Sequence, residues 1–146
     1  MNDITKKTIR LRRTIDKTDV EIEFSDPDEL TDAIHTLDNI SQRLSIEKIK
    51  QKTIQFWVQK NEVRKIIDDI KDGTHRVSLS LFEVWPDCKR AGQIQQDTGL
   101  SSGSVSNILM GRQGGCGSWF NQCPEGWRLS SKGIEDMEDK IISIYN

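Results

Sequence analysis

The side chains whose chemistry suits a nucleic acid lie in one stretch of the sequence, residues 89–132. Asn107 and Gln113 can pair with the edge of an adenine, and Arg112 with a guanine edge or a phosphate. The serines of this stretch suit contacts with either bases or phosphates. Four cations can neutralise phosphate charge: Lys89, Arg90, Arg128 and Lys132.

Two short helices joined by a tight turn are predicted to hold these side chains. The apolar positions have the spacing of a helix-turn-helix, because a steep helix crossing needs inward apolar groups on both sides of a left-handed glycine. Gly99 closes the first predicted helix, and Ser101 or Ser102 caps the second. A helix from Val77 to Trp85 precedes them, and Pro86 ends it. The inward positions are Ile94, Leu100, Val105 and Ile108.

A predicted two-stranded hairpin follows, with strands at 119–121 and 126–129, before a final helix with apolar Ile134, Met137, Ile141 and Tyr145. Residues 76–142 resemble the winged helix-turn-helix domains of prokaryotic, and especially archaeal, transcription regulators. The likeness lies in GQIQQDTGLS from Gly92, GSVSNIL from Gly103 and GWRLSSKG from Gly126. Gln95 departs from the family, which usually has a small residue there.

The resemblance implies that the second helix enters the major groove and that the hairpin contacts the backbone or the minor groove. It implies sequence-specific binding of double-stranded DNA by a transcription regulator. Carried over by position, the groove-facing residues are Ser101, Ser102, Ser104, Ser106, Asn107, Arg112 and Gln113, beside the phosphate candidates Arg90, Arg128 and Lys132.

The first third of the chain reads as a small ββα unit, residues 1–45. Alternating apolar residues predict strands at 8–12 and 20–24, and a helix start follows at 25–29. From Ile46 apolar positions recur at gaps of three and four, which predicts a long amphipathic helix over 46–73. Ile49, Phe56, Val63 and Ile70 form one row of a coiled-coil seam, which favours a homodimer through residues 46–72. A helix packed on its own domain explains the same pattern.

The predicted architecture is therefore α+β, with a ββα unit at 1–45, a connecting helix at 46–73 and a winged helix-turn-helix at 74–146. The 146 residues carry a net charge of only −2, but residues 73–132 hold six positive and four negative groups. That positive excess is small for a DNA-binding domain, so a second class of function is an alternative: a winged-helix module that binds protein or RNA without binding DNA. A ligand-responsive sensor is a third possibility.

No catalytic residue, metal site or cofactor is predicted, because the chain has no phosphate-binding loop and no nucleophile beside a histidine. We expect no enzyme activity, no membrane partner and a cytoplasmic location. The three cysteines are expected to be reduced thiols, although Cys116 and Cys123 can meet across the predicted wing as a metal pair or redox switch. Trp119 and Phe120 are the aromatic residues that a wing tip would expose.

Overall fold

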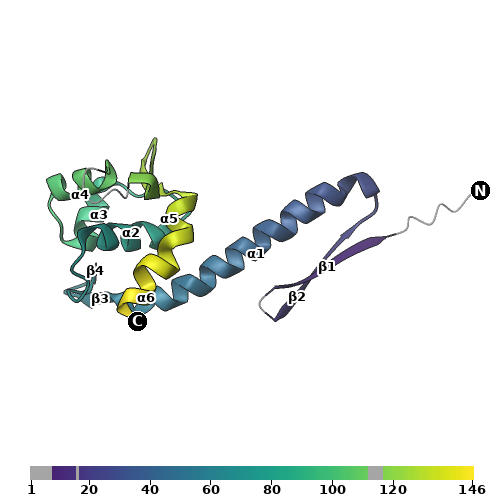
Figure 1. Cartoon of the computed structure of the whole chain (residues 1–146), viewed down its shortest axis with the longest axis horizontal. Helices are drawn as coiled ribbons and strands as arrows, with labels where there is room; N and C mark the ends of the chain where they lie inside the picture. Colours follow the sequence, from purple (N-terminus) through teal and green to yellow (C-terminus); the bar gives the residue numbers. More distant parts are fainter. Residues whose placement is uncertain (1–7, 16, 112–116) are drawn as a thin grey trace, which may run out of the picture. The chain divides into compact units, whose positions relative to one another are not determined.

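The computed structural model describes residues 8–15, 17–111 and 117–146, and these form two compact units. The first unit ends at Ile49 and the second runs from Lys50 to Asn146, so the boundary falls inside helix α1, Leu30–Thr53. Figure 1 labels helices α1 to α6 and strands β1 to β4. The class is α+β, with three separate two-stranded antiparallel sheets among the described residues, as predicted at the level of class.

The first unit is the predicted ββα arrangement. Strands β1, Ile9–Ile15, and β2, Thr18–Phe24, pair antiparallel with Leu11 opposite Ile22. Apolar and charged residues alternate along both strands, so one face is apolar, and on the other Arg12 donates to Glu21 across the pair at 3.0 Å. A 3-10 turn, Pro27–Glu29, capped by the Asp26 side chain, leads into α1.

The predicted long helix over 46–73 is wrong beyond Thr53. A short 3-10 turn, Ile54–Phe56, is followed by strands β3, Trp57–Lys60, and β4, Val63–Ile66. Asn61 and Glu62 connect them with positive φ angles of 50° and 67°, the backbone of a two-residue hairpin turn. This turn interrupts the helical pattern and reverses the chain.

Two residues of the expected coiled-coil seam, Phe56 and Ile70, lie instead in the interior of the second unit, whereas Ile49 and Val63 are only partly buried. Phe56, Ile66 and Ile70 are each at most 2% exposed. Their burial by other elements of the same chain accounts for the apolar pattern. The continuous helix on which a homodimer through residues 46–72 was predicted to form therefore ends at Thr53.

The rest of the second unit begins with helix α2, Gly73–Val84, which Asp72 caps at its N-terminus. The remaining elements are α3 (Ala91–Thr98), α4 (Ser102–Leu109), a 3-10 turn (Gly117–Trp119), β5 (Phe120–Cys123), β6 (Gly126–Leu129), α5 (Ser131–Asp136), a π-helical turn (Met137–Ile142) and α6 (Ser143–Tyr145). Helices α2, α3 and α4 pack against one another (Figure 1) around a core that includes Val77, Leu81 and Phe82.

Candidate nucleic-acid interface

The turn between α3 and α4 has the geometry that its residues predict. Gly99 is left-handed, with φ 71° and ψ 8°, and its N–H donates to the Gln95 carbonyl at 2.8 Å. The Ser101 hydroxyl accepts from the Ser104 N–H at 3.2 Å and so caps α4. Ile94 and Val105 are 0% and 1% exposed, and Gln95 is only partly buried at the crossing. Both the predicted helices and the predicted cap are confirmed.

The opposite side of α4 presents small polar groups to solvent. Ser102 and Ser106 are exposed, while Ser104 and Asn107 are half-buried. The Ser101 hydroxyl also donates to the Ser104 hydroxyl at 3.0 Å, so these two serines bond each other. Ser102, Ser106 and Asn107 have no side-chain hydrogen bond to any residue in the described part of the chain. These three are the members of the predicted groove-facing set that remain open to a ligand.

A short backbone pairing joins the segment before α3 to strand β6. Lys89 N–H donates to the Trp127 carbonyl at 2.8 Å, and Trp127 N–H donates to the Lys89 carbonyl at 2.9 Å. Arg90 and Arg128 directly follow Lys89 and Trp127 in the sequence, so both lie next to this pairing. Both arginines are exposed, and neither makes an ion pair with another described residue. They are two exposed positive charges at the junction of the helix-turn-helix and the β5–β6 hairpin.

Lys89 itself is not a phosphate contact, and that prediction is wrong. Its side chain is 6% exposed, and Nζ lies 2.5 Å from Oδ2 of the equally buried Asp97. The same ammonium donates to the Ser80 carbonyl at 2.8 Å, and Gln93 donates to the second Asp97 oxygen at 2.9 Å. A buried ion pair needs such additional hydrogen bonds to offset desolvation. Lys89 therefore fixes α2 and α3 together.

Lys132 is exposed, but it is paired within its own helix, since its Nζ lies 3.1 Å from Oδ1 of Asp136. Asp136 also accepts from the Trp119 indole N–H at 2.9 Å. Partial burial raises the pKa of the Asp136 carboxyl, but the hydrogen bonds from Trp119 and Lys132 and the positive charge of Lys132 outweigh it. The pKa of Asp136 therefore lies below its ordinary value. Lys132 is thus a weaker phosphate candidate than Arg90 or Arg128. Two further predicted contacts, Arg112 and Gln113, lie outside the described residues.

The prediction that the wing tip exposes aromatic side chains is wrong. Trp119 and Phe120 are 8% and 5% exposed, respectively. The Trp119 carbonyl accepts from Ser130 N–H at 2.7 Å, which holds the start of β5 against the start of α5. Bulky aromatic rings beside glycines were expected at a tip, but the indole N–H finds a partner in Asp136 and the rings enter the interior.

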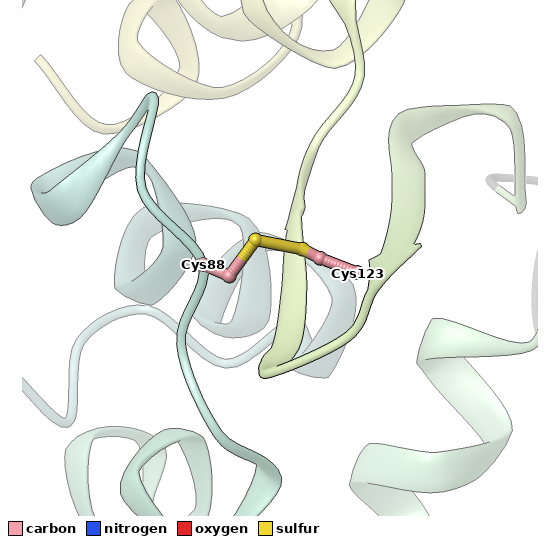
Figure 2. Close-up of a disulfide and its surroundings, with 2 residues drawn as sticks. All are labelled: Cys88 and Cys123. Atoms are coloured by element: carbon pink, nitrogen blue, oxygen red, sulfur yellow. A yellow bond between two sulfur atoms is a disulfide. The ribbon is translucent and has the colours of Figure 1, made fainter.

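A disulfide beside the Lys89–Trp127 pairing joins the segment before α3 to the β5–β6 hairpin. The prediction that these two cysteines are reduced thiols is therefore wrong. Cys88 and Cys123 are bonded across 35 residues of sequence, as Figure 2 shows. Cys116, the partner expected for Cys123, lies outside the described residues. The bond and Arg128 border the same open surface depression. The sequence did not reveal the pairing because it depends on β6 approaching the segment before α3.

Gly126 makes that approach possible. Its φ is 149°, and a Cβ at this position would lie 2.2 Å from the Lys89 carbonyl oxygen. A side chain there would push β6 away from Lys89. The β5–β6 hairpin is therefore attached to the helices by two backbone hydrogen bonds and a covalent bond.

Arg76 supports the whole arrangement, and no sequence motif marked it. From α2 it donates to the carbonyls of Thr98 at 2.8 Å, Ile67 at 2.7 Å and Ile70 at 2.9 Å, and more weakly to Ile66 at 3.2 Å. Burial lowers the pKa of this guanidinium, and the charge of Asp68 opposes the change. The sequence offered no signal for this role, because Arg76 precedes the helix that was predicted to begin at Val77.

No known protein family, curated protein or solved structure shows a match to this chain.

Two negative observations apply to the described ranges 8–15, 17–111 and 117–146. Within them, no three histidine, cysteine or acidic side chains gather closely enough to hold a metal ion. None of the helices in these ranges has the length and apolar character required to cross a bilayer.

Proposed function

We propose that this chain is a sequence-specific double-stranded DNA-binding transcription regulator that acts as a homodimer. Residues 74–146 would form its winged helix-turn-helix, with α4 in the major groove and the β5–β6 hairpin as the wing on the backbone or minor groove. Dimerisation would double a small cationic footprint and pair two recognition helices with two half-sites.

One observation carries the proposal: a helix-turn-helix and a hairpin are joined at a point that displays two exposed arginines. Arg90 is the N-cap residue of α3 and Arg128 lies on β6, and each is the next residue in sequence after one member of the Lys89–Trp127 pairing. Phosphate contacts of this kind set the register of a protein on DNA. Beyond them, α4 offers Ser102, Ser106 and Asn107 with unused hydrogen-bonding groups.

A second candidate function is a protein-binding module. It is favoured by the neutrality of α4, which carries no charged side chain in Ser102–Leu109. Such a module would bind a polypeptide with little dependence on salt and would not bind duplex DNA.

The test is the anisotropy of a labelled duplex titrated with full-length protein at several salt concentrations. We expect binding that weakens steeply with salt. In the Arg90→Ala/Arg128→Ala variant, the slope of log K against log salt should shrink by roughly 1.8 for each chain that contacts DNA, because each phosphate contact contributes about 0.9.

Arg43→Ala is the matched control, because Arg43 is exposed on α1 and belongs to the first unit. It should leave the salt slope unchanged. Light scattering on the same samples gives the number of chains. A double variant that binds with the wild-type slope would reject the proposed site, and salt-independent capture of a polypeptide without duplex binding would favour the second candidate.

A further inference from the structure

The outward face of α4 carries an unusual set of side chains. Gly103, Ser106 and Asn107, together with the C-cap residue Met110, recur at helical spacing. They lie opposite the core positions Val105, Ile108 and Leu109. Met110 is 55% exposed, although it is a large apolar residue. At Gly103 an added Cβ would meet nothing within 4 Å, so the helix surface is open there. This face offers one amide, one hydroxyl and one thioether.

Each DNA base pair presents a different pattern of groups in the major groove. An asparagine amide matches adenine, which offers the N7 acceptor and the N6 donor, and an apolar side chain suits the thymine methyl. Guanine is usually read by Arg or Lys, and the cytosine amine by Asp or Glu. None of these four residue types occurs between Ser102 and Met110. The described face of α4 is therefore equipped for A·T pairs.

The spacing of Asn107 and Met110 fits neighbouring base edges. Residues three apart on a helix have Cβ atoms about 5–6 Å apart. Successive bases on one strand are separated by roughly 3.4 Å along the helix axis. The amide and the thioether can thus reach the same base pair or two adjacent ones.

We propose that α4 selects A·T pairs in each half-site, with Asn107 hydrogen-bonding to an adenine and Met110 contacting a thymine methyl on the same or the next pair. This inference rests on the proposed DNA-binding function. It names the bases that the site reads and the two side chains that read them.

The experiment has two stages and uses the full chain. Sequences that bind are first selected from a randomised duplex library, and the enriched positions should include A·T pairs. In one selected duplex, 7-deazaadenine then replaces the specified adenine, which removes only N7, and in another uracil replaces thymine, which removes only the methyl group.

The expected loss of wild-type affinity is about 2- to 13-fold for the deaza substitution, because it removes one of the two hydrogen bonds to adenine, and about fourfold for the loss of a methyl contact. Asn107→Ala should bind the deaza and normal duplexes equally, and Met110→Ala should bind the uracil and thymine duplexes equally. Asn39→Ala is the matched control, because Asn39 is an exposed asparagine on α1. It should retain both sensitivities.

The outcomes separate the two proposals. Absence of any duplex binding overturns the proposed function and this inference with it. Duplex binding in which only G·C pairs are enriched, or in which Asn107→Ala remains sensitive to the deaza substitution, overturns this inference alone. Circular dichroism and thermal melting of each variant establish that it is folded.

Discussion

Breaking the Cys88–Cys123 disulfide should destabilise the second unit without changing its fold. The bond closes a loop between residues 35 apart in sequence. In the chain-entropy description, a loop of that length restricts the unfolded chain enough to contribute about 4 kcal/mol to stability. With a urea m-value of about 2 kcal/mol/M, the unfolding midpoint should fall by about 2 M on reduction.

The assay is urea unfolding of wild type and of Cys88→Ser/Cys123→Ser, each with and without a dithiol reductant. Reduced wild type and the double variant should unfold at similar midpoints, and the reductant should not affect the double variant. Cys116→Ser is the control, because it removes a thiol but leaves this bond intact. Thiol titration in denaturant should find two more thiols after reduction of the wild type. An unchanged midpoint in fully reduced wild type would refute the chain-entropy reasoning.

Two further predictions concern the attachment of the hairpin. Gly126→Ala should cost at least about 1 kcal/mol, because its φ is positive and the new methyl meets the Lys89 carbonyl. Gly92→Ala in α3 is the control, because its new methyl group would contact no atom within 4 Å and should not lower the stability of the protein. Equal urea midpoints for the two variants would contradict the close approach at Gly126. Because the pKa of Asp136 is lowered in the folded chain, its contribution to stability is present above the ordinary value of about 4 and is lost as pH falls through the folded value. Urea unfolding between neutral and acidic pH should show a shallower decline for Asp136→Asn, and parallel curves would exclude this role.

Local signals predicted the elements that depend on neighbouring residues. A left-handed turn needs a glycine, and Gly99 supplies it; a helix N-terminus needs a side-chain acceptor, and Ser101 supplies that. Strict alternation likewise revealed β1 and β2. These features are set by backbone conformation within a few residues, so a sequence pattern is sufficient to find them.

Features that depend on distant segments were not predictable in the same way. The helical spacing of Phe56 and Ile70 suited a seam, but tertiary burial placed them around a hairpin. Lys89 was counted as a surface cation because nothing near it in sequence indicates that it meets Asp97 in the interior. Of the proposed contacts, Arg90, Arg128, Ser102, Ser106 and Asn107 are accessible as expected, and whether DNA binds them remains a prediction.

The hydrogen bonds that Arg76 donates to backbone carbonyls have a consequence for local unfolding of the second unit. One guanidinium bonds the chain just after β4 and the last residue of α3, so separation of either segment would leave buried carbonyls without donors. Lysine cannot substitute, because its single ammonium lacks the planar fork that reaches several acceptors at once. We therefore expect the β3–β4 hairpin and α3 to open as one cooperative unit, with amide protons that exchange with solvent together.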